Sequence, residues 1–172
     1  MKRGCLYCYG DNIDRAMEVF HGFYPSIRLV YPMRMRRHYF HADKTFVDEP
    51  VPLLPGYLFF ETDQDLPEEK LARSSYLLRL LTYTDGEWEL HGVDDRFARM
   101  IMNTDGNIGI SKAYFDENKR IRILDGFLKD YEDSIIRVNR KSKTAEICID
   151  FQGKTRSMKL GYELDWPEAQ AV

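Results

Sequence analysis

The pattern of hydrophobic and polar positions changes along the chain at about residue 118. Before this point, short apolar runs alternate with stretches in which apolar residues recur at helical spacing. After it, apolar and polar residues alternate one by one in several short runs. The first pattern is typical of helices mixed with strands, and the second of strands with one face in a core and the other in water. The sequence therefore predicts an α+β domain followed by a small all-β domain.

The predicted α+β domain opens with a strand and a helix. Residues 4–9 are short, apolar and aromatic, which suits a strand. Asp11 is placed to cap a helix over about 12–22, and Pro25 follows where a helix has to have ended. The apolar residues of this segment recur at the spacing of one helix face: Ile13, Ala16, Met17 and Phe20.

Several strands are predicted between residues 27 and 60. Residues 27–33 indicate a second strand, and the basic stretch after it fits a strand pair joined by a loop near Ala42 and Asp43. The continuous apolar run at residues 57–60 is too short for a helix. It therefore predicts a buried central strand.

Two further helices and one strand complete the first domain. Pro67 stands where the first turn of a helix accepts it, and this helix is predicted to end near Ser75. A strand over residues 77–83 and a third helix over residues 93–102 follow. In this arrangement, helices cover one antiparallel sheet.

A linker is predicted between the two domains, because residues 105–118 are rich in Gly, Asn and Asp and lack strong periodicity. Several short strands in roughly fifty residues then indicate a small barrel. The predicted strands are residues 120–124, 134–139, 144–151 and 155–160. The predicted organisation is a domain at 1–104, a linker at 105–118, a second domain at 119–167 and a tail at 168–172.

Composition and charge refine this picture. The part before residue 119 is acidic and the part after it is mildly basic, which indicates two units with different partners. No run approaches the roughly 18 apolar residues of a membrane span, and no apolar stretch follows the basic start of the chain. Three cysteines, an odd number, favour reduced thiols. We therefore expect a cytoplasmic monomer with no membrane partner.

Catalytic and metal-binding patterns are weak. Cys5-x-x-Cys8 and His38-x-x-His41 together resemble a zinc site, but the gap between the pairs exceeds the usual spacing. Two cysteines three positions apart on a strand also face opposite sides of it. The chain shows neither a phosphate-binding glycine loop nor a nucleophile elbow. We therefore expect no metal, no cofactor and no enzymatic activity, and we keep a metalloprotein as the least favoured alternative.

Two motifs resemble those of NusG-type transcription factors. The segment LLPGYLF at residues 53–59 is similar to the signature of their N-terminal (NGN) domain, and the LYC strand at 6–8 and a basic hairpin after Pro32 stand where that domain has them. The segment KRIRILDG at residues 119–126 resembles the head of a KOW module. The chain looks closest to the specialised paralogs of the LoaP and RfaH types. The resemblance implies an NGN-like antiparallel sheet with flanking helices, followed by an SH3-like KOW barrel.

The resemblance also implies a function. It implies a transcription elongation and antitermination factor that binds RNA polymerase through the N-terminal domain, and DNA, nascent RNA or a ribosomal protein through the KOW domain. Because alternate residues of a strand face opposite sides, some of the implied polymerase-binding residues belong to the core. These residues are Tyr7, Leu54, Pro55, Gly56, Tyr57 and Phe59.

Basic residues in both domains are candidates for nucleic-acid contact, with a solvated face as the alternative. Few aromatic residues, Phe127 and Tyr131, are available beside them for base stacking. A ribosome-associated or other RNA-binding KOW protein that does not act on polymerase is the second interpretation, and the motif at residues 53–59 argues against it. The candidate nucleic-acid-binding residues are Arg15, Arg34, Arg36, Arg37, Arg137, Arg140, Lys141, Lys143, Lys154 and Arg156.

Overall fold

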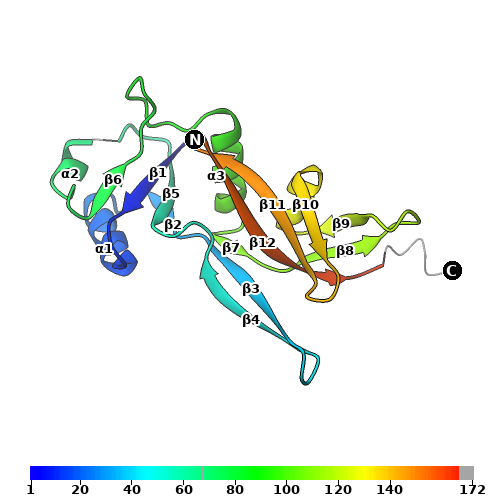
Figure 1. Ribbon diagram of the computed structural model, residues 1–172. Coiled ribbons are helices and arrows are strands. Elements are labelled where there is room, and N and C mark those ends of the chain that lie inside the picture. Colours follow the sequence, from blue (N-terminus) through cyan, green and yellow to red (C-terminus); the bar gives the residue numbers. More distant parts are fainter. Residues whose placement is uncertain (67, 167–172) are drawn as a thin grey trace. The chain divides into compact units, whose positions relative to one another are not determined.

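The computed structural model describes residues 1–66 and 68–166 and confirms the α+β class. The chain divides into two compact units (Figure 1). The first combines Met1–Pro32 with Pro52–Asn107, and the second combines Met33–Val51 with the chain from Ile108 onward. The predicted role of Pro67 and the predicted tail at 168–172 lie outside the described residues. Each unit is described by itself below.

A four-stranded sheet in the order β2-β5-β1-β6 forms the centre of the first unit. The central strands β1 and β5 run antiparallel, with Tyr7 opposite Tyr57 and Leu6 opposite Leu58. The predicted buried strand at 57–60 is confirmed as part of β5. The strands are β1 (Lys2–Cys8), β2 (Arg28–Val30), β5 (Tyr57–Thr62) and β6 (Leu78–Leu80).

Helices cover both faces of this sheet. On one face, α1 and α2 close a core that contains Phe20, Leu58 and Phe60. On the other face, α3 packs against β5, where the ring centroids of Phe59 and Phe97 are 5.8 Å apart. The alternation of side chains along β5 supplies both cores. The helices are α1 (Ile13–Phe23), α2 (Glu68–Ala72) and α3 (Gly92–Asn103).

The start of α1 differs from the prediction in its capping residue. The carboxamide oxygen of Asn12, and not the carboxylate of Asp11, accepts a hydrogen bond from the backbone N–H of Arg15 at 3.3 Å. This is an N-cap interaction of a helix that begins at Ile13. The predicted cap was therefore wrong by one residue, although the helix itself is confirmed.

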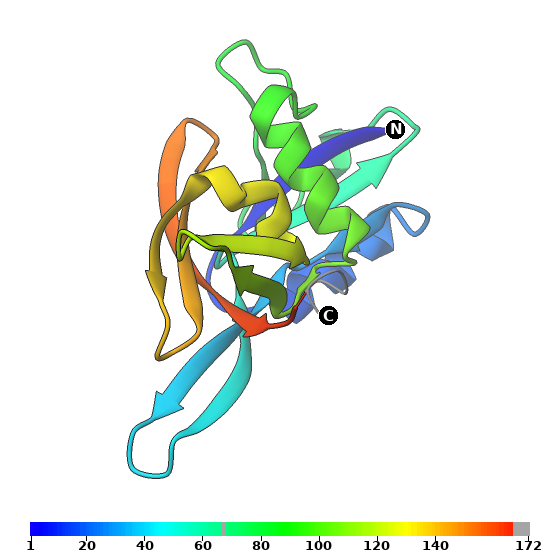
Figure 2. The same cartoon turned by 90° about the vertical axis from the view of Figure 1, so that its right-hand side faces the viewer.

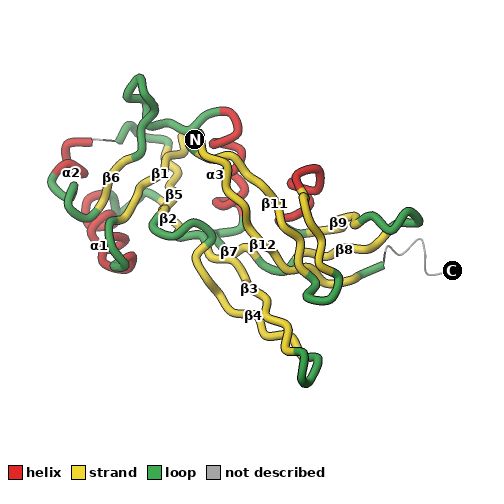
Figure 3. Tube along the Cα trace, viewed as in Figure 1, coloured by secondary structure: helices red, strands yellow, loops and turns green. Residues whose placement is uncertain are grey.

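The second unit is mainly β-structure and contains a five-stranded sheet in the order β10-β11-β12-β8-β9 (Figure 3). The strands curl into a half-barrel beside the 3₁₀ helix η1 (Figure 2). All four strands predicted after residue 118 are confirmed, with ends that shift by a few residues. The elements are β8 (Ser111–Phe115), β9 (Ile121–Asp125), η1 (Phe127–Ser134), β10 (Ile135–Asn139), β11 (Thr144–Phe151) and β12 (Lys154–Leu164).

The stretch predicted as a linker contains the strand β8. It pairs antiparallel with β9 and parallel with β12, and its inward residues Ser111 and Ala113 are buried. Gly126 passes so close that a Cβ atom there would lie 2.6 Å from the Ser111 Oγ. The inward positions are small because the space is narrow, so they give only a weak hydrophobic signal. Residues 105–118 are therefore not a connector without structure.

The predicted basic strand pair is confirmed as a hairpin. It consists of β3 (Met33–Phe40) and β4 (Thr45–Pro52), with a turn over residues 41–44, and the short strand β7 (Asn107–Ile108) completes a three-stranded sheet in the order β4-β3-β7. Residues 33–51 of this hairpin are grouped with the second unit. The unit boundaries therefore differ from the predicted domains, which placed the hairpin within residues 1–104.

Candidate functional site

A group of tyrosines gathers at one end of the central strands in the first unit. The rings of Tyr7 and Tyr57 meet at a centroid distance of 5.2 Å, and Tyr9 meets Tyr7 edge to face at 5.4 Å. Tyr7 and Tyr57 are half-buried, and Tyr9 is 42% exposed. We call Tyr7, Tyr9 and Tyr57 the tyrosine cluster. Each ring presents apolar area with a polar hydroxyl, a combination enriched at protein interfaces.

The turn before β5 holds this cluster in place. The Tyr57 N–H donates to the Leu54 carbonyl at 3.1 Å, and the Cys8 N–H donates to the Gly56 carbonyl at 2.7 Å. Gly56 has a φ of +84°, and a Cβ atom there would lie 2.9 Å from the Tyr7 ring. Glycine is therefore required for two reasons, its backbone conformation and its close approach to Tyr7.

Tyr31 lies beside the same turn. Its half-buried position raises the pKa of its hydroxyl, and a hydrogen bond from the Gly56 N–H acts in the opposite direction. The pKa of the neighbouring Cys8 thiol is also raised, mainly by burial and further by Asp11. In both groups burial is the largest cause of the shift, so the surroundings of the turn disfavour the ionised forms.

The implied polymerase-binding residues divide between surface and core. Leu54 and Phe59 are 3% and 0% exposed, and Phe59 packs under α3. These two residues therefore belong to the core. Tyr7, Gly56 and Tyr57 are half-buried, and Pro55 is exposed. Sequence reasoning missed Tyr9, the most exposed ring of the cluster, although it ends the aromatic run at residues 4–9.

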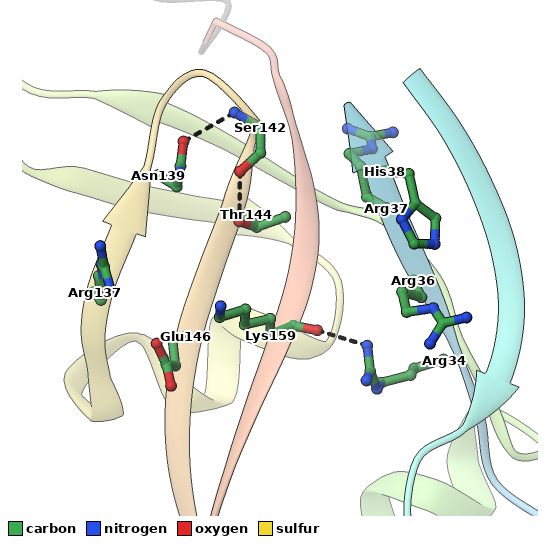
Figure 4. A pocket seen from close by; sticks show the side chains of 10 residues that line it. All are labelled: Arg34, Arg36, Arg37, His38, Arg137, Asn139, Ser142, Thr144, Glu146 and Lys159. Carbon is green, nitrogen blue, oxygen red and sulfur yellow. Dashed lines mark hydrogen bonds between the residues drawn. The ribbon is translucent and has the colours of Figure 1, made fainter. Parts of the chain in front are cut away.

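A basic groove of about 340 Å³ lies within the second unit (Figure 4). One wall is β3, and the other is formed by β10, β11, β12 and the turn between β10 and β11. The groove brings Arg34, Arg36 and Arg37 together with Arg137, although the sequence placed them in different domains. The lining residues are Arg34, Arg36, Arg37, His38, Arg137, Asn139, Ser142, Thr144, Glu146 and Lys159.

Strand register explains how three of these side chains meet. Glu146 on β11 pairs with Arg137 on β10 and with Lys159 on β12. Along β11 the buried Ala145 and Ile147 alternate with the half-buried Thr144 and Glu146, so the polar positions face outward. A row of three charged residues therefore crosses the outer face of the sheet and forms one wall of the groove.

Arg37 fastens the hairpin to this sheet. Its guanidinium donates to both carboxylate oxygens of Asp48 at 2.7 and 2.8 Å, to the Tyr162 carbonyl at 3.0 Å and to the Glu163 carboxylate at 2.7 Å. Its side chain is 3% exposed. The hydrogen bonds from Arg37 hold the pKa of Asp48 below its ordinary value. Arg37 is thus committed to the fold and has little surface left for nucleic acid.

Arg34 is in a different situation. Its Nη1 donates to the Lys159 carbonyl at 2.9 Å, while its buried Nε has no hydrogen-bond partner among the described residues. Burial lowers the pKa of Arg34, and the neighbouring charge of Arg36 lowers it further. Arg36 itself is paired, because its Nε donates to the Glu49 carboxylate at 2.7 Å. The charge of Arg34 therefore lies in the groove without a counter-charge.

The groove as a whole carries excess positive charge. Within the described part of the chain, no carboxylate lies within ion-pair distance of Arg34, Arg137 or Lys159. Glu146 is the carboxylate among the lining residues, and it accepts a hydrogen bond from the Ser157 hydroxyl. An anion placed between the two walls would meet at least three cationic groups, two of them flanking the single carboxylate of Glu146, so positive charge remains in excess.

The remaining basic candidates do not line the groove. Arg140 stacks over Phe115 at 4.1 Å, and Lys141 and Lys143 lie over rings of the hairpin, Tyr39 at 5.9 Å and Phe46 at 5.1 Å. Lys154 and Arg156 belong to the other end of the sheet, at the start of β12. Arg15 belongs to the first unit, where it pairs with Glu18 at 3.1 Å.

The two aromatic candidates for base stacking pack against each other within the fold. Phe127 is 6% exposed and stacks on the half-buried Tyr131 at 5.1 Å. Among the residues that the structure describes, no group of three or more His, Cys, Asp or Glu is placed to hold a metal ion. Nor does any helix of the described ranges have the length and apolarity to cross a membrane.

No family model matches the chain, and no curated protein matches it either. The resemblance to NusG-type factors therefore rests on the motifs at residues 53–59 and 119–126 and on their order along the chain.

Proposed function

We propose that this protein is a NusG-type transcription elongation and antitermination factor that acts by binding and not by catalysis. In this proposal, the first unit is the NGN-like part and docks on RNA polymerase. The second unit is the KOW-like part and contacts nucleic acid. Bridging the two sides of the polymerase cleft would hold the enzyme in its processive state and disfavour pausing.

The tyrosine cluster is the observation that carries the proposal. It lies on the turn formed by the LLPGYLF motif, at the place where the resemblance implies polymerase contact. Three adjacent, partly exposed rings form a preorganised apolar surface, since Gly56 and the strand pair fix their positions. Rigid aromatic side chains lose little entropy on binding and are enriched among residues that dominate interface energy.

The test is binding of the full chain to core RNA polymerase, measured by biolayer interferometry. We expect Tyr57→Ala to weaken binding about tenfold, or about 1.4 kcal/mol. Tyr76→Ala is the matched control, because Tyr76 is 78% exposed in the same unit and lies outside the cluster. The full chain is needed because a fragment ending near residue 108 would separate the hairpin from the rest of its unit.

Two results would contradict the proposal. Absence of binding to polymerase by the folded full chain is one, and equal weakening by Tyr57→Ala and Tyr76→Ala is the other. If the protein fails to bind polymerase but co-sediments with ribosomes, the ribosome-associated interpretation replaces it. Circular dichroism spectra of both variants verify that the substitutions leave the fold intact.

A further inference from the structure

We propose that the basic groove binds the sugar–phosphate backbone of a single RNA strand, and that the hairpin and the half-barrel form this site together. This inference rests on one part of the proposed function, namely that the second unit contacts nucleic acid. It differs from the expectation drawn from the sequence, in which basic hairpin ends of the second domain made the contact. The structure places the uncompensated charge elsewhere, between β3 and the β10-β11-β12 face (Figure 4).

Charge is the first argument. Arg34 approaches from the hairpin, while Arg137 and Lys159 approach from the sheet, and none has a carboxylate partner among the described residues. Cations that the protein itself neutralises gain little from an external anion. By contrast, cations without partners on opposite walls of one groove attract phosphates directly and release their counterions on binding.

The buried edge of Arg34 is the second argument. Its Nε is shielded from solvent and has no acceptor within the described residues. Leaving a buried donor unpaired is unfavourable, and more so for a charged group. A shift of the Arg34 side chain that opened Nε to the groove would let a phosphate oxygen supply the missing acceptor. The planar guanidinium also offers paired donors that match the geometry of a phosphate.

The uncharged residues that line the groove favour contact with the backbone of a nucleic acid over contact with its bases. Phe, Tyr and Trp are absent from the lining residues, and the one ring there, that of His38, lies at hydrogen-bonding distance (3.0 Å) from the Glu49 carboxylate. The groove therefore lacks a large stacking platform. At one end, Asn139, Ser142 and Thr144 are linked by hydrogen bonds of 2.9–3.0 Å, which fixes their orientation. Polar groups and cations without aromatic rings are typical of contacts to phosphate and sugar, which position a strand without reading its sequence.

Glu146 favours RNA over DNA. A carboxylate opposes phosphate binding, yet Glu146 stands in the middle of the charged row between Arg137 and Lys159. One of its oxygens accepts from Ser157. A carboxylate oxygen facing a bound strand would accept a hydrogen bond from a ribose 2′-hydroxyl, the group by which proteins distinguish RNA from DNA. The size of the groove, at the small end of ligand sites, suits one strand and not a duplex.

The experiment measures fluorescence anisotropy of a labelled oligouridylate about twelve nucleotides long, titrated with the full chain, at several salt concentrations. We expect Arg34→Gln and Arg137→Gln each to weaken binding at least threefold. Each should also lower the slope of log affinity against log salt by about 0.7, the value for one phosphate contact on a single strand. Lys154→Gln is the matched control, since Lys154 is an exposed cation at the other end of the same sheet.

Competitors identify the ligand. Oligodeoxythymidylate and duplex RNA of the same length should compete less well than oligouridylate, and Glu146→Gln should reduce the preference for RNA over DNA. Inorganic triphosphate should compete only weakly, because it lacks the ribose hydroxyl that Glu146 would bind. The proposal is overturned if Arg34→Gln and Arg137→Gln bind RNA like the parent, or if Lys154→Gln is equally defective. Competition by triphosphate as strong as that by RNA would make this a small-anion site and would equally overturn it.

The groove variants are also tested for binding to core RNA polymerase in the absence of nucleic acid. They should bind as the parent does, because Arg34 and Arg137 lie outside the tyrosine cluster. Loss of polymerase binding by Tyr57→Ala with intact RNA binding would support both proposals independently. A chain that binds RNA through the groove but never binds polymerase would remove the proposed function and leave the groove assignment standing.

Discussion

The tyrosine cluster and the basic groove are built in opposite ways. The cluster is neutral and comes from two adjacent strands and one turn, held by Gly56 at short range. The groove is charged and combines a hairpin at residues 33–51 with strands that begin at residue 135 or later, as the pairing of Arg37 with Glu163 across 126 positions illustrates. The first depends on one backbone conformation, and the second on ion pairs between distant segments. Separate perturbations should therefore disable them separately.

The largest expected effect is on the cluster. Gly56→Ala adds a Cβ atom 2.9 Å from the Tyr7 ring at a φ of +84°. We expect it to lower the free energy of unfolding by about 2–3 kcal/mol and to abolish docking on polymerase. Urea denaturation measures the first effect. The matched control is Gly10→Ala, at a φ of +75° with no atom within 4 Å, which should cost only about 1 kcal/mol. Equal costs would show that the close approach to Tyr7 is unimportant.

The next effect is on the groove. Arg37→Met removes the ion pairs of a side chain that is 3% exposed. Asp48 then loses its cation, while Glu163 keeps Lys143 at 3.5 Å. Because both carboxylates remain partly solvated, we expect a loss of about 2 kcal/mol in thermal or urea unfolding, and not the full cost of a buried pair. Arg36→Met is the control, since Arg36 and Glu49 are about half exposed. That change should cost less than about 1 kcal/mol. Arg37→Met should leave polymerase docking intact. Loss of docking in this variant would show that the cluster and the groove do not act independently.

The smallest expected effect is a loss of folding stability at acidic pH. Hydrogen bonds from Arg37 lower the pKa of Asp48 below 3.8. Since the folded pKa lies below the unfolded one, this carboxylate contributes stability above pH 3.8 that is lost as the pH falls through the folded pKa. We expect a lower urea midpoint at about pH 3 than at about pH 5. Asp48→Asn should flatten that decline. An unchanged decline would assign the acid sensitivity to other carboxylates.

Sequence patterns predicted the helices and strands better than they predicted which of these elements pack together. Alternation located β11 within residues 144–151, because three of its four inward residues are large and apolar. The same rule missed β8, whose inward residues Ser111 and Ala113 are small to fit beside Gly126. The hairpin strands were predicted, but their place in the second unit was not. That place depends on Arg37 finding acceptors on β12, and no local pattern encodes such a pairing.

The candidate sites show the same limit. The motif at residues 53–59 indicated the right turn, but it could not tell that Phe59 is buried while Tyr57 is only half-buried. Phe59 is covered by Phe97 of α3, a contact that the motif does not encode. Among the charged residues of the groove, composition suggested Arg34 and Arg137. It overlooked the basic Lys159 and the acidic Glu146. Their meeting depends on the register of three strands, which becomes visible only when the strands are paired.

The separation in sequence between the hairpin and β12 has a consequence for how the protein is made. Arg37 leaves the ribosome 126 residues before Glu163, its partner on β12. At a synthesis rate of about 5–20 residues per second, the hairpin waits roughly 6–25 s for the strand that receives it. During that time its basic and aromatic faces are open to the nascent chain and to solvent. The second unit therefore closes only after β12 has been synthesised, and β12 is the strand that completes both the half-barrel and the groove.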